Sequence, residues 1–420
     1  WGNTLTLASA VTASDKSLGY IRKHMSRVLM RPPGIFDPRD HHPDFGDSFE
    51  SALFLLPPRT KATGGGIISI VELAFALMKR GIFIQCAVTP SVDVEDKFAS
   101  AFPEEYLKGL FVGYEAPDRI GKISKLSQRF QFIVATHFQT VEWMKDIIAV
   151  NRLVNPAYFV QDYEPWFYKA TDTSGQRQIA LSSYSLINNQ LIFAKTNWLK
   201  TIVEKNHGVT VAKIEPSVNG FGRDRHNITL PIRIAAMLRP RTPRRGATMT
   251  LAVMKQLKSM FGDIVMINFF GCQSEDITSH GLSDLANFDF KLHGVLNRAE
   301  MGELLQSVDI FADFSTWQAF GRTGLESMSA GCVPIMPKLG GANDYCTHGI
   351  SCLLVDSKDQ NSCVNSIRSI IVDQSQLQRL KNKALSVSRN FGVERAVESI
   401  VRVFNENLRD KQRYIEKSHV

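Results

Sequence analysis

Short apolar runs alternate along the chain with segments whose apolar residues recur at helical spacing. Continuous apolar runs of this kind predict strands buried on both faces of a parallel sheet. In the first half of the chain, the predicted strands are Ala52–Leu56, Ile82–Val88, Leu110–Val112, Phe132–Ala135, Ala157–Val160, Leu191–Ala194 and Val209–Ile214. The predicted helices of this half are Ile67–Arg80, Val141–Val150 and Ser182–Asn188. This order is typical of βαβ units.

A second series of strands and helices follows the polar stretch 220–229. Its predicted strands are Ile232–Leu238, Val265–Phe270, Phe290–Leu292, Ile310–Phe314, Val333–Met336 and Cys352–Val355. Its predicted helices are Met249–Met260, Arg298–Gln306, Gly324–Ala330, Asn361–Val372 and Ser375–Asn390. We therefore predict an α/β protein with two facing, doubly wound Rossmann-like domains. Ligands of such sheets bind at the carboxyl ends of the strands, which predicts one interdomain cleft.

The pattern divides the chain into a lead-in, two domains and a C-terminal segment. The predicted regions are 1–50, 51–225, 226–390 and 391–420. The lead-in is polar and irregular, with a short helix expected near Lys16–Met30. In the last region, apolar spacing predicts a helix over Phe391–Leu408, and the charged Arg409–Val420 is expected to fray or to lead to another domain.

Composition fits a folded protein and narrows its partners. Of the 420 residues, 44% are hydrophobic and 21% charged, and 49 Lys+Arg against 41 Asp+Glu give a net charge of +8. This mild excess suits phosphate-bearing partners or an anionic membrane surface. No apolar run is long enough to span a membrane. The six cysteines show no metal-binding spacing, which favours reduced core thiols and a cytoplasmic location. The first residue, Trp1, suggests a piece of a longer chain.

Two segments of the first half carry candidate site residues. Gly64, Gly65 and Gly66 lie between a strand and a helix, where the backbone can approach a ligand closely. Their spacing is neither a dinucleotide fingerprint nor a P-loop, and a flexible turn is the alternative. His137 follows the strand Phe132–Ala135, where it either contacts a substrate hydroxyl or phosphate or has a structural role.

The segment Tyr158–Trp166 runs from a strand directly into carboxylates interleaved with aromatic residues. Asp162 and Glu164 lie beside Tyr163 and Trp166. Carboxylates bond sugar hydroxyls, while aromatic faces stack on sugar C–H groups. The alternative is a rim loop in which Trp166 fills the core.

An arginine-rich turn follows the strand Ile232–Leu238. Four arginines occur within seven residues, Arg239, Arg241, Arg244 and Arg245, immediately before a helix. Guanidinium groups bind phosphate bidentately, and the helix dipole adds to their attraction. The turn therefore predicts a diphosphate site, with a solvated basic loop as the alternative. Because the charge is confined to one turn, nucleic-acid binding is disfavoured.

The most informative segment is Ser315–Gly331, a strand end, a glycine turn and a short helix. Backbone N–H groups of Phe320, Gly321, Arg322 and Thr323 are expected to face a diphosphate, and Glu326 to accept both ribose hydroxyls. An ordinary strand–turn–helix with an exposed Glu326 is the alternative.

These residues resemble the signature of GT-B glycosyltransferases of family 4, E-x-F-G-x-x-x-x-E-[AS]-M-[AS]-x-G-x-P followed by G-G-x-x-E. This chain has Gln318-Ala319-Phe320-Gly321, then Glu326 to Pro334, then Gly340 to Asp344. The resemblance covers about residues 50–405. The segment Phe159–Trp166 is additionally similar to WsaF-type rhamnosyltransferases of bacterial surface-glycan assembly.

The resemblance implies a GT-B fold in which the C-terminal domain holds the donor nucleotide and the N-terminal domain the acceptor. It implies that Glu326 binds the ribose, that Arg239 and Arg245 bind the diphosphate, and that His137 lies near the donor sugar. The C-terminal helix is expected to cross back to the N-terminal domain. Two departures occur: Gln318 replaces the first acidic residue, and the arginine turn is one residue longer, so that Arg244 is a second candidate for the diphosphate.

We therefore expect an enzyme that transfers a sugar from dTDP-rhamnose or a UDP-hexose to a growing, lipid-linked bacterial glycan such as O-antigen. Because cations and N–H groups can stabilise the departing diphosphate, no cofactor or metal is expected.

Relatives of this type retain anomeric configuration, although Asp162 or Glu164 is a candidate inverting base. Peripheral membrane association and membership of a larger polymerase are expected. The alternatives are a sugar-nucleotide epimerase, a glycogen-phosphorylase-like protein, or an inactive glycan-binding module, to which Gln318 points.

Overall fold

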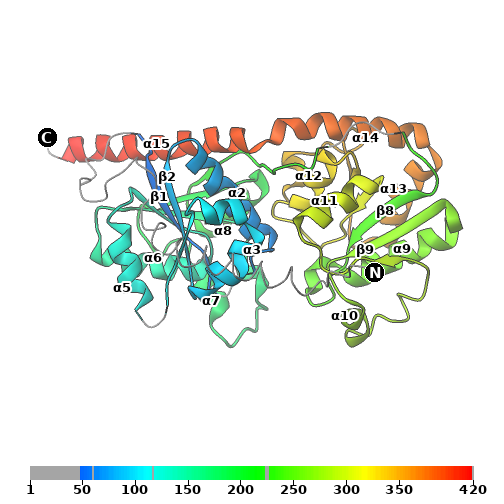
Figure 1. The fold of residues 1–420 in the computed structure, drawn as a ribbon, viewed down its shortest axis with the longest axis horizontal. Helices are drawn as coiled ribbons and strands as arrows, with labels where there is room; N and C mark the ends of the chain where they lie inside the picture. The colour runs from blue at the N-terminus through cyan, green and yellow to red at the C-terminus, as the bar shows by residue number, and fades with distance from the viewer. Residues whose placement is uncertain (1–47, 59–60, 116–117, 223–226, 419–420) are drawn as a thin grey trace, which may run out of the picture.

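The computed structural model describes residues 48–58, 61–115, 118–222 and 227–418, with the backbone alone for residues 415–418. The helix expected near Lys16–Met30 lies outside the described residues. Two lobes lie side by side, each built around a parallel sheet (Figure 1).

The N-terminal sheet has the strand order β3-β2-β1-β4-β5-β6-β7, and all its pairs are parallel. Its strands are β1 (Ser51–Leu55), β2 (Phe83–Val88), β3 (Phe111–Gly113), β4 (Phe132–Ala135), β5 (Asn155–Val160), β6 (Leu191–Ala194) and β7 (Val211–Lys213). The helices of this domain are α2 (Gly65–Lys79), α3 (Ala99–Ala101), α4 (Pro103–Leu107), α5 (Arg119–Ser127), α6 (Phe138–Val150), α7 (Gln176–Ser182) and α8 (Asn197–His207). Each predicted strand of this half is present.

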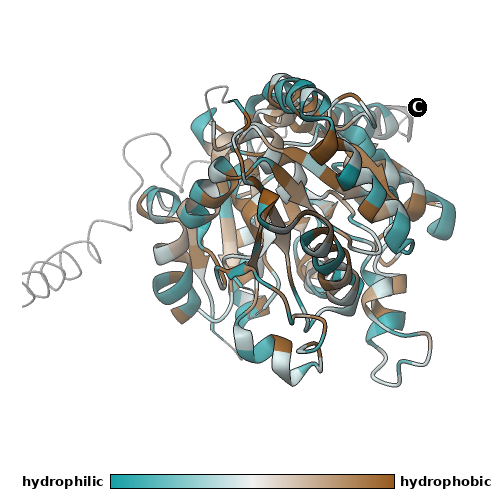
Figure 2. Ribbon diagram, turned by 90° about the vertical axis from the view of Figure 1, so that its right-hand side faces the viewer, coloured by the Kyte–Doolittle hydropathy of each residue, from teal (hydrophilic) through white to brown (hydrophobic). Residues whose placement is uncertain are grey.

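The C-terminal sheet has the order β10-β9-β8-β11-β12-β13, again parallel throughout. Its strands are β8 (Ile232–Met237), β9 (Val265–Phe270), β10 (Lys291–Leu292), β11 (Ile310–Ala312), β12 (Val333–Pro337) and β13 (Leu353–Val355). Its helices are α9 (Ala247–Phe261), α10 (Ser274–Ser279), α11 (Arg298–Ser307), α12 (Arg322–Ser329), α13 (Gln360–Val372) and α14 (Gln374–Ser388). Hydrophobic residues are concentrated on the strands, and hydrophilic residues on the outward helix faces (Figure 2). The sequence pattern therefore predicted both sheets correctly.

One predicted helix is wrong. Residues 183–189 form turns, and helix α7 ends at Ser182 instead of beginning there. The Gln190 side chain donates to the carbonyls of Ser183 and Tyr184, both at 3.0 Å, and Asn189 adopts a left-handed φ of 58°. These local side-chain bonds take the place of helical ones. Helices α5 and α8 were not predicted, although the Thr196 side chain caps α8 by accepting from Leu199 N.

The last helix, α15 (Val393–Ser418), is longer than predicted. It lies along the N-terminal lobe, while α14 lies along the C-terminal lobe on the same side of the molecule (Figure 1). Phe404 is fully buried against Phe49, Phe132 and Phe193. Lys411 donates to Asn155 Oδ1 at 2.5 Å, inside the segment expected to fray. The chain therefore crosses back to the first domain, and that expected fraying is wrong up to Ser418.

The aromatic contact of α15 gives a stability prediction. Phe404→Ala removes a buried ring and leaves a cavity, so we expect the free energy of unfolding to fall by about 3–5 kcal/mol. Chemical denaturation followed by circular dichroism measures this loss. Tyr414→Ala, at a position of the same helix that is 77% exposed, is the control and should change little. An equal effect of both variants would contradict the docking of α15 through Phe404.

Candidate active site

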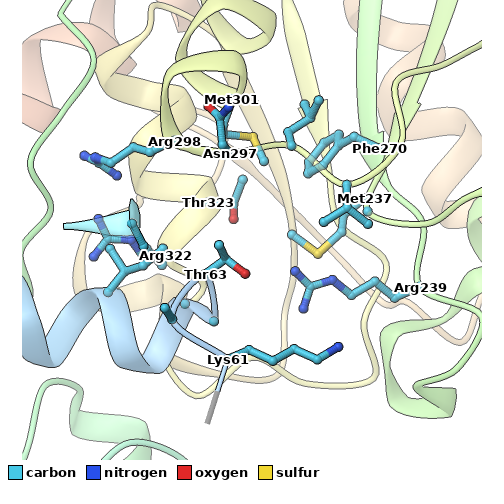
Figure 3. Close-up of a pocket in the computed structure, with 18 of the residues that line it drawn as sticks. Lys61, Thr63, Met237, Arg239, Phe270, Asn297, Arg298, Met301, Arg322 and Thr323 are labelled. Carbon is cyan, nitrogen blue, oxygen red and sulfur yellow. The ribbon is translucent and has the colours of Figure 1, made fainter. Parts of the chain in front are cut away.

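A cleft with two adjoining cavities, of about 850 Å³ and 390 Å³, runs between the domains at the carboxyl ends of both sheets. Both cavities are lined by Lys61 and Gly64 from the first domain and by Arg239 and Thr323 from the second. In Figure 3, Lys61 and Thr63 face Arg239 and Thr323 across the larger cavity. These volumes are in the range of small-molecule sites.

The arginine turn places two guanidinium groups in this cleft, and neither forms a salt bridge within the described residues. Gly246, which starts α9, has a φ of 65°, and a Cβ there would lie 2.3 Å from Phe314 O, so the turn requires glycine. Arg239 and Arg245 line the smaller cavity, and within the described part of the chain neither forms a salt bridge with a carboxylate. Burial, followed by the charge of Arg244, lowers the pKa of Arg245 to about 10. A bound anion would offset this unfavourable burial.

Arg244 lies in the same turn but is paired across the cleft. Its Nη2 is 2.9 Å from Asp162 Oδ2, and its guanidinium lies over the rings of Phe167 and Trp317, at 5.0 Å and 5.2 Å from their centroids. Trp317 Nε1 donates to Asp162 Oδ1 at 3.3 Å. Both predicted residues, Arg244 and Asp162, are therefore in the cleft, where each is bound to the other.

The glycine turn lies opposite the start of α2. Gly321 has a φ of 75° and a Cβ there would lie 2.8 Å from the Tyr345 hydroxyl. Phe320, Gly321, Arg322 and Thr323 all line the smaller cavity. Neither α12 nor α2 has a side-chain cap, so the unpaired N–H groups of two helix starts are available to an anion.

The predicted ribose ligand, Glu326, takes part in an ion-pair network between the domains. Its Oε1 accepts from Arg322 Nε at 2.9 Å and from Arg298 Nη1 at 3.0 Å. Arg322 also donates to Glu72 at 2.7 Å and to Ser69 at 3.2 Å, both on α2. Glu326 is buried and lines the larger cavity. The sequence did not show the roles of Glu72 and Arg298, whose partners are distant along the chain.

The partly exposed His137 and the buried Glu164 lie close together and line the smaller cavity. The ring nitrogen His137 Nε2 is 3.9 Å from Glu164 Oε1, and His137 caps α6 through Nδ1 and Gln139 N at 3.4 Å. Glu164 Oε2 accepts from Tyr158 Oη and from Phe138 N, both at 2.7 Å. Burial raises the pKa of Glu164 to about 8 and lowers the pKa of His137 to about 4. At neutral pH, His137 is therefore neutral and Glu164 largely protonated.

Gln318 is buried at the edge of the smaller cavity and bonds to a carboxylate that the sequence did not single out. Its Nε2 donates to Asp313 and, at 3.3 Å, to Ser315 Oγ. Asp313 follows β11 and attracts Arg239 and Arg245 electrostatically. Asp313 lies inside the predicted strand Ile310–Phe314, where a single carboxylate in an apolar run was an available signal.

Further residues in the cleft, and the buried Lys195 beside it, were not predicted. Lys61 lines both cavities, and Phe270 and Leu296 line the larger one. Lys195 follows β6 and is buried with its Nζ 5.2 Å from the Phe320 ring centroid. Burial, followed by the charge of Arg322, lowers the pKa of Lys195 to about 7. Apolar and single cationic positions of this kind have no local sequence signature.

No metal-binding cluster and no membrane-spanning helix occurs within the described ranges. Among those residues, no three His, Cys, Asp or Glu side chains gather around a common point. None of the described helices is both long and apolar enough to cross a membrane.

Solved structures of low sequence identity share the fold. The Anabaena protein Alr3699/HepE, in complex with UDP and glucose, aligns with a TM-score of 0.68 and 17% identity over 85% of this chain and 100% of its own. Sucrose-phosphate synthase from Thermosynechococcus elongatus aligns with a TM-score of 0.68 and 13% identity over 85% of this chain and 98% of its own. With the two facing parallel sheets, these matches confirm the predicted GT-B fold.

A protein family also matches the C-terminal part of the chain. Residues 224–387 match the family model described as glycosyl transferases group 1. The second domain is therefore similar to glycosyl transferases group 1, which agrees with the predicted enzyme class. The narrower resemblance to rhamnosyltransferases stays a prediction.

Two curated proteins match part of the chain. O-antigen biosynthesis protein RfbC of Myxococcus xanthus is 29% identical over 204 residues, which are 47% of this chain and 15% of that protein. Uncharacterized glycosyltransferase YqgM of Bacillus subtilis is 23% identical over 144 residues, 33% of this chain and 39% of that protein. The chain thus spans well under two thirds of either relative.

The protonated state of Glu164 gives a pH prediction. Between about pH 4.3 and 8 the unfolded chain has lost the Glu164 proton while the folded protein keeps it, so this contribution to stability falls as the pH rises. His137 opposes the trend only below about pH 6.5, because its pKa is lowered on folding. From about pH 6.5 to 8, wild type should therefore lose stability relative to Glu164→Gln, whose neutral amide can still accept both bonds.

Thermal unfolding of both proteins at closely spaced pH values measures this difference. Glu398→Gln, at an exposed position of α15, is the control and should follow wild type. Parallel wild-type and Glu164→Gln profiles would show that Glu164 is already ionised in the folded protein.

Proposed function

We propose that the chain transfers a sugar from a nucleoside-diphosphate sugar to a glycan acceptor, with the donor bound mainly by the C-terminal domain. The observation that carries this proposal is the pair of unpaired guanidinium groups, Arg239 and Arg245, in a cleft that two uncapped helix starts also face. Such a concentration of donors suits a diphosphate.

The shape of the cleft supports one orientation of the donor. The diphosphate would lie at Arg239 and Arg245, near Thr323 and the start of α2 at Gly64–Gly66. The nucleoside would occupy the larger cavity, with Glu326 at the ribose and Phe270 beside the base. The sugar would then point into the smaller cavity, toward His137 and Gln318.

In this arrangement the protein acts mainly by electrostatics. Glycosyl transfer passes through an oxocarbenium-like state while negative charge builds up on the leaving diphosphate. Cations and N–H groups that are fixed in a partly dry cleft stabilise that charge without reorganising. Arg239 and Arg245 supply this stabilisation, so we propose that no metal takes part.

We further propose that the anomeric configuration is retained. An inverting transfer needs a carboxylate base beside the acceptor hydroxyl. Glu164 is buried and largely protonated at neutral pH, while Arg244 and Trp317 occupy the two oxygens of Asp162. Neither predicted base is therefore free in this structure, which favours a route that does not require one.

For the acceptor, we propose a growing bacterial surface glycan on a lipid carrier, with a deoxyhexose such as rhamnose, or a hexose, as the donor sugar. The similarity to an O-antigen biosynthesis protein supports the glycan acceptor. Because this chain matches only part of that relative, we also propose that it acts within a larger multi-domain protein, at the inner face of a membrane.

Nucleotide binding tests the donor site. Arg239→Ala and Arg245→Ala each remove charge-assisted bonds to the diphosphate, so we expect UDP or dTDP to bind about 10- to 100-fold more weakly. Isothermal titration calorimetry measures the dissociation constants. Arg368→Ala, an exposed position on α13 that lines neither cavity, is the control. Unchanged affinity in both site variants would overturn the donor site, and binding without any turnover of a nucleotide sugar would indicate an inactive glycan-binding module.

Removal of divalent metal tests the electrostatic mechanism. Since the protein's own cations would stabilise the diphosphate, we expect EDTA to leave the rate of nucleotide-sugar hydrolysis or transfer unchanged within about two-fold. A loss of activity that Mg²⁺ or Mn²⁺ restores would contradict metal independence.

A further inference from the structure

An aromatic cluster lies at the mouth of the smaller cavity and is built by both domains. Trp166 and Phe167 come from the short helix Glu164–Phe167 after β5, Trp198 from the first turn of α8, and Trp317 from the loop after β11. The Trp166 ring lies 5.2 Å from Trp317 and 6.0 Å from Trp198, centroid to centroid. Phe167 lines the cavity itself. We refer to Trp166, Phe167, Trp198 and Trp317 as the aromatic rim.

Packing does not bury this rim. Trp166 is 42% exposed and Phe167 is 44% exposed. The ring planes of Tyr163, Trp198 and Trp317 are inclined to that of Trp166 by 80°, 65° and 78°. Within the described residues, no ring therefore stacks face to face on Trp166. Two large aromatic side chains remain open to water beside the cleft, which is unfavourable unless something covers them.

Polar groups next to the rim lack partners. Arg244 lies on Phe167 and Trp317, and its buried Nη1 has no hydrogen-bond acceptor. The buried Gln161 Nε2 likewise has none, and Gln161 lines the same cavity. Buried donors without acceptors are costly, so both nitrogens are suited to oxygen atoms of a ligand. Asp162 Oδ2 binds Arg244 and keeps a second lone pair, which can accept from a hydroxyl group.

Exposed aromatic rings beside unpaired donors and a carboxylate are the chemistry that recognises carbohydrate. A pyranose ring has an apolar C–H face, which stacks on an aromatic ring, and a rim of hydroxyl groups, which bond to polar side chains. We propose that the aromatic rim is an acceptor subsite for an oligosaccharide, in which Trp166 and Phe167 contact sugar faces while Gln161 and Arg244 donate to sugar oxygens. That the bound oligosaccharide is the acceptor rests on the proposed glycosyl transfer. That the rim binds an oligosaccharide does not.

The composition of the rim argues for a chain of sugars rather than for a single one. Trp166 and Phe167 are adjacent in sequence, while Trp198 and Trp317 extend the surface over α8 and the second domain. The rim thus begins at the smaller cavity and continues outward over two domains. If the terminal sugar of an acceptor places its hydroxyl group in the cavity, the preceding sugars of the same chain would lie on the rim.

Glycan binding by site variants tests this subsite. The probe is an array of synthetic fragments of bacterial O-antigens, including rhamnose oligosaccharides, to which wild type, Trp166→Ala, Phe167→Ala and Trp166→Phe are applied. We expect Trp166→Ala and Phe167→Ala to lose about ten-fold in affinity for the fragments that wild type binds, because one stacking contact is removed. Trp166→Phe keeps an aromatic face and should retain most of the binding. Tyr414→Ala, an exposed aromatic on α15, is the control.

The readouts separate the subsite from the donor site. UDP affinity, measured in parallel, should be unchanged in Trp166→Ala and Phe167→Ala, and in a transfer assay the KM for the acceptor should rise while the KM for the donor stays constant. Thermal unfolding identifies any variant that fails to fold, in which case Trp166→Ser or Phe167→Ser replaces it. The subsite would be overturned if both alanine variants bound glycan as tightly as wild type does. It would also be overturned if wild type bound UDP but none of the arrayed glycans. Wild type that binds glycan but no nucleotide would overturn the proposed transfer and leave the subsite standing.

Discussion

The buried guanidinium group of Arg322 links the two domains inside the cleft, and the geometry of the cleft depends on this contact. Arg322 lies on α12 of the second domain and donates to Ser69 and Glu72 on α2 of the first. A buried charge must be paired, so separation of the domains would remove both arginine partners of Glu72 and leave Arg322 with Glu326 alone. Because Arg322 also binds Glu326, the contact between the domains and the proposed ribose site share one carboxylate. Binding of a ribose at Glu326, as proposed, would therefore be coupled to the contact between the domains.

The arginines of the cleft have different roles because carboxylates lie near some of them and not others. Arg244 and Arg322 each bind a carboxylate of the opposite domain and hold the two halves together. Arg239 and Arg245 have no such partner in the described structure, although Asp313 lies near enough to attract them. Unpaired cations in a partly buried cleft are unfavourable until an anion arrives. This difference supports the proposed binding of a donor diphosphate at Arg239 and Arg245.

The features that could be predicted from the sequence are those whose signal is local. Apolar runs and helical spacing predicted every strand of both sheets and most of the long helices, because burial requires that pattern whatever the neighbours are. The arginine turn and the glycine turn were found because their residues are adjacent along the chain. The helix predicted at Ser182–Asn188 was wrong because the Gln190 side chain takes over the carbonyls of Ser183 and Tyr184. Glu72, Arg298 and Asp313 were missed because their significance comes from partners elsewhere in the chain.

By itself, the amino-acid sequence determined the fold class, the position of the cleft and the arginines that lie in it. The fold class and the arginines follow from short-range patterns. The position of the cleft follows from the rule that ligands of parallel sheets bind at the carboxyl ends of the strands. Only the tertiary structure decided which arginines are paired, which carboxylate is protonated and which aromatic residues are exposed. Trp166 was expected either to contact sugars or to fill the core, and its surroundings place it at the mouth of the cleft. Pairing, burial and pKa depend on atoms that are close in space but distant along the chain, and for that reason no local pattern contains them.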